Sequence, residues 1–296
     1  MGNTKLVWGS GLAVLVLIAL AWWLASVFLP QGGALPNLEP TGQKVIRLSY
    51  TLSNSTSENI EEFQFSAFAP VNIDGYQTLD FIDSTIDYAL SGEPHMRNID
   101  MRINGLAPFG SRVITMTLGV GVYDGPKYER INPSDYLGAE RYIEIDEPEI
   151  RRLANRIAEE TESFQHDAFE WVRANITDAG YIAQNRGAKF AIHERLGDCT
   201  EFMYAFVALA RAQGIPARGV AGFVVNSNAA VLSASDYHNW AEFHDGERWV
   251  LVDPYKGVFD DQYENYLAFR LIGGTNNYSG SARRFLAVDE RVSVRF

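Results

Sequence analysis

The chain opens with an unbroken apolar run before any amphipathic pattern appears. Residues 6–29 (LVWGSGLAVLVLIALAWWLASVFL) contain no charged side chain. As a helix they would extend about 36 Å, enough to cross the roughly 30 Å hydrocarbon core of a bilayer. Because no polar face interrupts the run, it predicts an uncleaved transmembrane signal-anchor within residues 1–29. A cleaved signal peptide is the alternative, although its apolar stretch is usually only about 7–15 residues long.

A linker and a strand-rich region follow the apolar run. We assign the linker to residues 30–43, which include the Pro- and Gly-rich segment PQGGALPNLEPTG. In residues 44–146, apolar alternation and β-branched residues separated by turn-forming stretches indicate strands. The predicted strands are 45–52, 62–68 and 112–122. This pattern predicts an antiparallel β-sandwich that serves as a packing or recognition module.

After Pro148 the apolar spacing becomes helical. Helices are predicted at 149–157, 162–176 and 200–213, and strands at 218–225, 237–243 and 248–252. Helices followed by an antiparallel sheet predict an α+β domain over residues 147–296.

Composition and charge narrow the class of function. The chain has 296 residues, more than one typical domain, and 47% of them are apolar, which is enough for packed cores. Its 37 acidic and 25 basic residues give a net charge of −12. This charge excludes nucleic-acid binding driven by phosphate neutralisation. The single cysteine, Cys199, excludes a disulfide within the chain and a cysteine-rich zinc site.

The charges that flank the apolar run predict its orientation. Lys5 precedes the run, and the next charged residue is Glu39. By the positive-inside rule the N-terminus stays in the cytoplasm and the chain after residue 30 is exported. We therefore expect a single-pass protein of the inner or plasma membrane, with its C-terminal domains facing the periplasm or the exterior.

Cys199 stands where the helix predicted at 200–213 begins, directly after a Gly-Asp turn. The free N–H groups and partial positive charge of a helix N-terminus favour a thiolate and can also stabilise an oxyanion. A buried, inert cysteine is the alternative. An unpaired thiol outside the cytoplasm favours the functional interpretation. Asp198 is expected to act as a turn or helix-cap residue.

A hairpin pattern selects one histidine as the partner of this thiol. The predicted strands at 237–243 and 248–252 are joined by His244-Asp245-Gly246-Glu247, and Asp-Gly is a strong hairpin signal. A turn centred there pairs residues whose numbers sum to 491, so His238 would face Asp253. Such a pair forms a hydrogen bond that orients the imidazole. An incidental surface salt bridge is the alternative. The competing histidines without such a partner are His95, His166, His193 and His244.

Three segments in this order resemble the transglutaminase-like superfamily of papain-fold cysteine enzymes. They are GDCTEFMYAFVALARAQGIPARGVAGF, HNWAEF and WVLVDP, and the resemblance covers about residues 150–260. It implies that Cys199 is the nucleophile, His238 the base and acid, and Asp253 the orienting carboxylate. It also implies that Glu201 and Glu242 are structural hydrogen-bonding residues.

The resemblance leaves details of the site open. Trp240 and Trp249 would be core aromatics or would wall the cleft. The Cys199 N–H is one expected oxyanion donor, while Gln184 and Asn185 are weak candidates for the second. Animal members imply calcium, but the acidic residues of the C-terminal part lack the spacing of a calcium loop, so we expect no metal and no cofactor. The acidic residues considered are Asp260, Asp261 and Glu264.

The expected function is cysteine-dependent acyl transfer on a protein or peptide substrate of the cell envelope, through a thioester. Hydrolysis of that thioester makes a peptidase or amidase, which we favour. Capture by an amine makes a cross-linking transglutaminase, which is the alternative. A non-catalytic envelope scaffold that binds partners is the alternative from another class.

Overall fold

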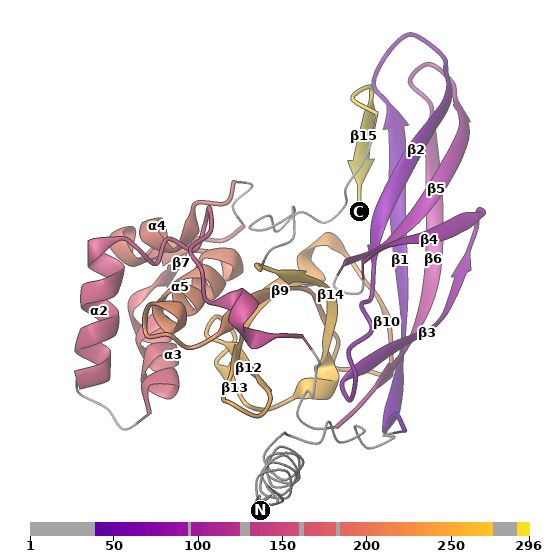
Figure 1. Ribbon diagram of the computed structural model, residues 1–296. Coiled ribbons are helices and arrows are strands. Elements are labelled where there is room, and N and C mark those ends of the chain that lie inside the picture. Colours follow the sequence, from indigo (N-terminus) through magenta and orange to yellow (C-terminus); the bar gives the residue numbers. More distant parts are fainter. Residues whose placement is uncertain (1–38, 94–95, 125–130, 160–162, 182–183, 275–288) are drawn as a thin grey trace, which may run out of the picture. The chain divides into compact units, whose positions relative to one another are not determined.

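The computed structural model describes residues 39–93, 96–124, 131–159, 163–181, 184–274 and 289–296 (Figure 1). The signal-anchor predicted within residues 1–29 lies outside these ranges, as does most of the linker. No helix in the described ranges is long and apolar enough to cross a membrane.

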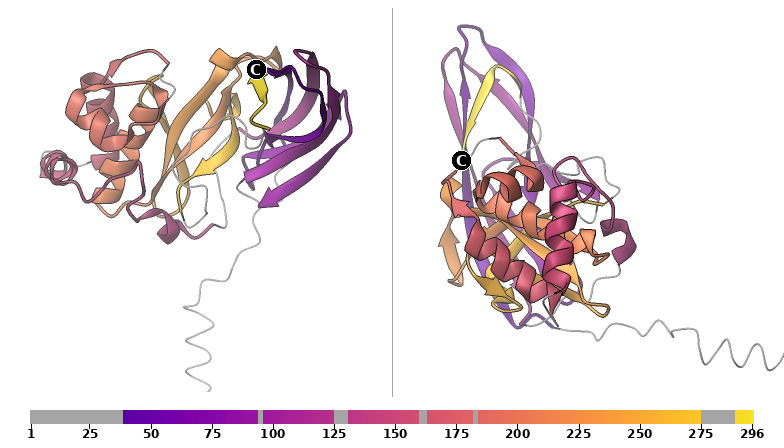
Figure 2. Two further views of the ribbon diagram at one scale, coloured as in Figure 1. Left: turned by 90° about the horizontal axis from the view of Figure 1, so that it is seen from above. Right: turned by 90° about the vertical axis from the view of Figure 1, so that its left-hand side faces the viewer.

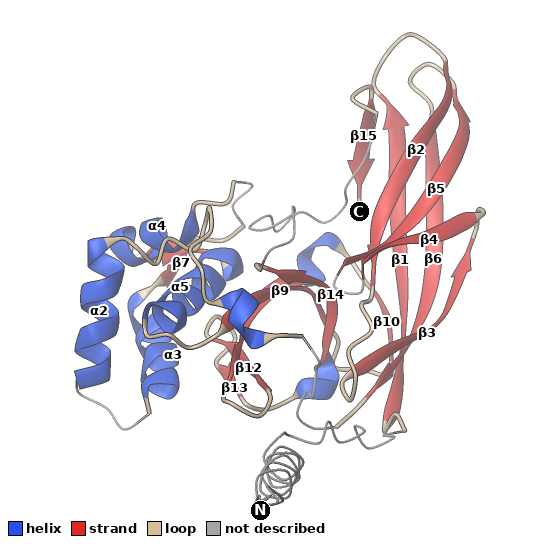
Figure 3. Ribbon diagram, viewed as in Figure 1, coloured by secondary structure: helices blue, strands red, loops and turns tan. Residues whose placement is uncertain are grey.

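Two sheets, drawn in red in Figure 3, make up the strand-rich part of the fold. The first sheet has the order β10 (Ala229–Val231), β1 (Gly42–Asn54), β6 (Ser111–Val122) and β3 (Gln77–Ser84), with β15 (Val292–Arg295) also paired to β1. The second sheet has the order β13 (Val258–Phe259), β12 (Trp249–Asp253), β11 (Tyr237–His244), β9 (Ala217–Val224), β14 (Tyr266–Ile272), β5 (Met96–Leu106) and β2 (Ile60–Ala69), with β4 (Tyr88–Glu93) also paired to β5. Apart from the parallel β1–β10 pair, the pairs within these two sheets are antiparallel.

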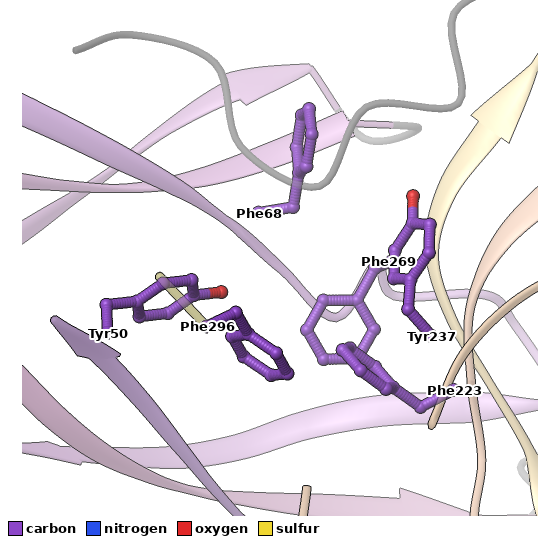
Figure 4. Close-up of a pocket in the computed structure, with 6 residues that line it drawn as sticks. All are labelled: Tyr50, Phe68, Phe223, Tyr237, Phe269 and Phe296. Atoms are coloured by element: carbon purple, nitrogen blue, oxygen red, sulfur yellow. The ribbon is translucent and has the colours of Figure 1, made fainter. Parts of the chain in front are cut away.

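Alternating side chains of the two sheets share one apolar core. In β1 the buried positions Ile46, Leu48 and Leu52 point to the same side, as the period of two requires. They pack in one cluster with Phe65 of β2 and Ile99 of β5. Figure 4 shows a group of aromatic side chains in this core, contributed by Tyr50, Phe68, Phe223, Tyr237, Phe269 and Phe296.

The second sheet crosses the boundary expected near residue 147. Strands β2, β4 and β5 precede that boundary, whereas β9, β11, β12, β13 and β14 follow it. The two regions meet where Arg270 of β14 pairs with Met96 of β5. Phe223 and Leu267 from the later strands belong to the same apolar cluster as Phe65. The expected boundary therefore separates two stretches of sequence, and strands of both contribute to one sheet.

Helices cover the strands β9, β11 and β12 on the side away from the first sheet (Figure 2). They are α2 (Pro148–Glu159), α3 (Phe164–Asn175), α4 (Gly187–Glu194) and α5 (Cys199–Ala212). Every residue of α5 from Thr200 to Arg211 is buried, because the other helices pack on one side of it and β9 and β11 on the other. A short parallel pair of β7 (Thr177–Asp178) and β8 (Leu196–Gly197) leads into α5.

The architecture confirms the α+β prediction: β1 to β6 precede the helices, and β9 to β15 follow them in the same two sheets. Each predicted strand and helix is present within three residues of its predicted bounds. The sequence interpretation missed α4 and β14, and it did not resolve β3, β4 and β5. It also did not predict the short strands β7, β8, β10, β13 and β15. Three short 3-10 helices complete the described elements: η1 (Pro133–Tyr136), η2 (Ala234–Asp236) and η3 (Tyr263–Asn265).

Candidate active site

Cys199 is the first residue of α5 and is half-buried. Asp198 caps the helix: its Oδ1 accepts a hydrogen bond from the Thr200 N–H at 2.8 Å. The Glu201 carboxylate in turn accepts the Asp198 N–H at 3.2 Å, which completes a capping box. The predicted cap role of Asp198 is thus confirmed. The cap holds the cysteine at the positive end of a helix that is fixed within the core.

His238 and Asp253 form a buried pair. The Nε2 atom of His238 lies 2.7 Å from Oδ2 of Asp253, and the two residues are 5% and 0% exposed. The Cys199 side chain lies close enough to His238 to raise the pKa of the imidazole. Because Nε2 is engaged by Asp253, Nδ1 is the ring nitrogen left for the sulfur. The structure therefore brings together the three residues that the sequence analysis singled out.

The register that led to this pair was wrong by two residues. Ala241 pairs with Val252 and His244 with Trp249, so paired numbers sum to 493 and not to 491. His244 continues β11, since its N–H donates to the Pro216 carbonyl at 2.8 Å. The turn then begins at Asp245, whose Oδ1 accepts hydrogen bonds from the N–H groups of Glu247 and Arg248. A shift of two residues keeps every side chain on its face, which is why His238 still reaches Asp253.

Burial and the nearby negative charge shift the pKa of His238 in opposite directions. Burial lowers the pKa of this imidazole, but the Asp253 carboxylate and the hydrogen bonds to Asp253 and Cys199 raise it to about 9. The imidazole therefore carries its proton at neutral pH. A cysteine at a helix N-terminus beside such an imidazolium has the surroundings in which thiols act as nucleophiles.

Aromatic rings surround the histidine. The Trp240 ring lies nearly parallel to the His238 ring, with centroids 6.4 Å apart, and Trp240 is fully buried. On another side lies Tyr255, with its ring centroid 5.7 Å from that of His238 and its hydroxyl 2.8 Å from Asp178 Oδ2. Trp240 therefore meets both expectations, as a core residue and as a wall beside the histidine. Tyr255 was not predicted from the sequence.

Asn239 is a further residue at the thiol that the sequence analysis missed. Its Nδ2 donates to Thr200 Oγ1 at 2.9 Å and lies 3.9 Å from Cys199 Sγ. The side chain is 3% exposed, and its Oδ1 has no hydrogen-bond partner among the described residues. The one available signal was the position next to His238, on the face of β11 that the packed helix α5 covers.

The other predicted polar residues lie elsewhere. Glu242 pairs with Arg218 at 2.7 Å, both fully buried, and Glu201 bonds the Arg186 N–H at 3.0 Å, which confirms both as structural residues. Trp249 is fully buried, as expected for a core aromatic. Asn185 donates to the Tyr204 hydroxyl at 3.4 Å, and Gln184 is exposed.

The competing histidines interact away from Cys199. His193 contacts Glu149 at 3.0 Å, His166 contacts Asp167 at 3.6 Å, and His244 accepts from the Gly246 N–H. His95 lies outside the described residues. Both oxygens of Asp260 bond Arg248 at 2.8 Å. Within the described ranges no group of three or more His, Cys, Asp or Glu side chains could hold a metal ion.

Comparison with known proteins finds a superfamily match whose range includes all three residues. Residues 151–254 match the transglutaminase-like superfamily. The uncharacterized protein YebA of Bacillus subtilis (strain 168) is 27% identical over 172 residues, which cover 46% of this chain and 23% of that protein. The chain thus spans less than a quarter of that relative.

Solved structures give two further likenesses. A candidate cysteine protease from Cytophaga hutchinsonii has a TM-score of 0.60 at 15% identity, covering 85% of this chain and 84% of the other. It therefore shares the fold. The periplasmic domain of TgpA from Pseudomonas aeruginosa has a TM-score of 0.36 at 17% identity, covering 75% and 84% of the two chains, too low to bear on the fold.

Cys199, His238 and Asp253 all fall within the matched residues, whereas Tyr255 and β14 follow them in the chain. The chain therefore carries a transglutaminase-like superfamily core at residues 151–254.

Proposed function

We propose that this protein is a membrane-anchored thiol enzyme that hydrolyses amide or peptide bonds through a thioester on Cys199. The proposal is carried by one observation: a buried His238–Asp253 hydrogen bond of 2.7 Å beside a cysteine that begins a helix. His238 is the base and acid, and Asp253 orients it. The fold shared with a candidate cysteine protease supports the same class of chemistry.

The proposed reaction starts from a Cys199 thiolate and a protonated His238. The sulfur attacks the carbonyl carbon, and the carbonyl π electrons move onto oxygen, which the Cys199 N–H at the start of α5 can stabilise. As the C–N bond breaks, the leaving nitrogen takes the proton of His238 and departs as an amine. Water then attacks the thioester, neutral His238 accepts a proton from that water, and the C–S bond breaks. The acid product leaves, and the thiolate and imidazolium are restored.

Alkylation of Cys199 with iodoacetamide tests the chemistry without a known substrate. We expect the wild-type thiol to react fast at neutral pH, and His238→Ala to slow it by about tenfold or more, since the imidazolium that stabilises the thiolate is lost. His193→Ala is the matched control, because His193 is exposed and bonds Glu149. Equal rates in the wild type and His238→Ala would contradict the proposal.

Hydrolysis and amine transfer share the thioester, so a second experiment separates them. The protein is incubated with a glutamine-containing peptide and a fluorescent primary amine. Release of ammonia without labelled peptide is expected for the hydrolase. Incorporation of the amine would replace the hydrolase by a cross-linking transglutaminase.

We further propose that the apolar run at residues 6–29 anchors the chain in the cell membrane, with everything after residue 30 outside the cytoplasm. The substrate would then be a protein or peptide of the cell envelope. Protease added to spheroplasts should digest the part after residue 30. Complete protection in sealed spheroplasts, with digestion after lysis, would contradict this orientation.

A further inference from the structure

Asp253 has a second side-chain partner besides His238. The Tyr266 hydroxyl donates to Asp253 Oδ2 at 2.8 Å, the same oxygen that binds His238, and the Lys256 N–H donates to Oδ1 at 3.0 Å. Tyr266 is 1% exposed and is the first residue of β14. This strand follows the segment that matches the superfamily, residues 151–254. One contributor to the site therefore comes from outside the matched core.

The direction of the Tyr266 hydrogen bond is fixed by chemistry. Burial and the nearby Asp253 carboxylate raise the pKa of the Tyr266 hydroxyl far above its ordinary value, so it stays protonated. An ionised carboxylate has no proton to donate. The hydroxyl must therefore donate to Oδ2, and it draws charge from the oxygen that faces the imidazole.

The backbone of β14 is held by the segment Val71–Gln77 from the N-terminal half of the chain. The Tyr76 hydroxyl donates to the Tyr266 carbonyl. The Gln77 side chain accepts the Ala268 N–H at 2.8 Å and donates to the Ala268 carbonyl at 2.7 Å. The Val71 N–H also donates to that carbonyl, at 3.0 Å. These buried bonds leave the start of β14 little freedom to move.

We propose that Tyr266, held by Val71–Gln77, is a positioning residue for the thiol chemistry: its hydroxyl orients the Asp253 carboxylate and disperses its charge. This inference rests on the proposed function. Without the hydroxyl, the full charge of Oδ2 would face His238, which would hold its proton more tightly. A tightly held proton favours the thiolate–imidazolium pair but is transferred more slowly to a leaving amine.

The variant Tyr266→Phe removes the hydroxyl and keeps the ring. We expect the pH at which His238 loses its proton, followed by NMR of its ring protons, to rise by about one unit, because one hydrogen bond to the carboxylate is lost. The alkylation of Cys199 by iodoacetamide is expected to depend on His238 only while the imidazole is protonated. The pH at which this dependence ends should therefore rise by the same amount. Tyr76→Phe removes the hydrogen bond to the Tyr266 carbonyl and should shift both pH values in the same direction, but less.

Tyr263→Phe is the matched control. The Tyr263 hydroxyl is also buried and bonds a carboxylate, Asp260, at 2.7 Å, but it does not touch the His238–Asp253 pair. A merely structural role for Tyr266 would lower thermal stability in both variants and shift the His238 titration in neither. That result would overturn the inference.

The outcome also separates this inference from the proposed function. If His238→Gln leaves the alkylation of Cys199 unchanged in the otherwise wild-type chain, the proposed function fails and the role of Tyr266 fails with it. If His238→Gln slows alkylation while Tyr266→Phe and Tyr76→Phe titrate like the wild type, the proposed function stands and only the role of Tyr266 is overturned.

Discussion

At the residue scale, the protonation of His238 controls the proposed chemistry. Burial lowers its pKa, and the Asp253 charge together with its hydrogen bonds raises it to about 9. The imidazole is thus charged below about pH 9 and neutral above it. The thiolate–imidazolium pair and the proton for the leaving amine are both lost as the pH rises past that point. We therefore expect the rate of hydrolysis to fall on the alkaline side of about pH 9, measured as kcat/KM against pH.

Asp253→Asn tests whether the Asp253 carboxylate sets the pH at which the rate falls, which we call the break in the pH profile. An asparagine keeps the size of the side chain but removes the charge, so the break should move down towards the ordinary imidazole pKa of about 6.5. Asp245→Asn is the control, because Asp245 lies in the exposed turn of the same hairpin and bonds only local N–H groups and Arg248. A break that stays near pH 9 in Asp253→Asn would exclude the carboxylate as its source.

Asn239 carries a second prediction at this scale. Its Nδ2 lies 3.9 Å from Cys199 Sγ and also holds the Thr200 hydroxyl, so it can stabilise a thiolate. We expect Asn239→Ala to slow the alkylation of Cys199 several-fold, up to about tenfold, and Asn239→Asp to slow it further by placing a negative charge there. Iodoacetamide kinetics at fixed pH measure both.

The control for Asn239 is Asn54→Ala. Asn54 is also a buried asparagine, 2% exposed, and its side chain bonds backbone carbonyls in the strand-rich half. Its loss should reduce stability and leave the reactivity of Cys199 unchanged. Equal reactivity of the wild type, Asn239→Ala and Asn239→Asp would rule out this role for Asn239.

Some of these residues could be predicted from the sequence and others could not, for physical reasons. His238 and Asp253 were found because a hairpin with a short turn joins their two strands, and a register error of two residues kept both side chains on the same face. Asn239 points to the opposite face of β11, so its approach to Cys199 depends on how α5 packs there. Tyr266 reaches Asp253 only because β14 inserts next to β9, a long-range pairing that no local pattern encodes.

At the scale of elements, α5 depends on its N-terminal cap. The Asp198 and Glu201 side chains satisfy N–H groups at the start of the helix, where Cys199 lies. We expect Asp198→Ala to lower the free energy of unfolding by about 1 kcal/mol, within the usual range for a lost cap. The change is measured by urea unfolding.

The same variant should also slow the alkylation of Cys199, because the first turn of α5 loses its fixed position. Asn132→Ala provides the comparison, since Asn132 caps the 3-10 helix η1 with a bond to the Ser134 N–H. It should leave the thiol unaffected. Unchanged stability and unchanged alkylation in Asp198→Ala would show that the cap does not hold the site.

The elements that the sequence missed differ in pattern from those it predicted. In β1 buried and less buried positions alternate, which is the signal of a strand with one face in the core. In β14 (YLAFRLI) all seven residues are buried, since the strand lies between β9 and β5 with packing on both faces. Such a run shows no alternation of apolar and polar residues, and the residues on either side of it do not mark where the strand begins or ends. The short helix α4 offered too few turns for a helical period to show.

At the scale of the whole molecule, the superfamily core does not contain all that supports its site. The matched residues 151–254 end before β14, while β9 and β14 bury Phe223, Leu267 and Phe269 against strands of the N-terminal half. The bonds from Val71–Gln77 to β14 add a polar connection. Contacts group Leu38–Phe296 into one compact unit. The strand-rich region (residues 44–146) and the superfamily core (residues 151–254) are therefore expected to unfold together.

Phe269→Ala tests this cooperation. Phe269 is 3% exposed and packs edge-on against Phe223, with ring centroids 5.0 Å apart. Its loss should cost about 3–5 kcal/mol of unfolding free energy, as large-to-small substitutions of buried aromatics do. Far-ultraviolet circular dichroism follows the helices, and the fast alkylation of Cys199 by iodoacetamide follows the site, since it needs the intact His238–Asp253 pair. In the full chain, the midpoints of the two unfolding transitions should shift to a lower urea concentration by the same amount. Phe109→Ala, at a 71% exposed position, should shift neither. Two separate transitions, with Cys199 still alkylated fast after the strand-rich region (residues 44–146) has unfolded, would mean that the core is stable alone and that β14 needs no partner strands.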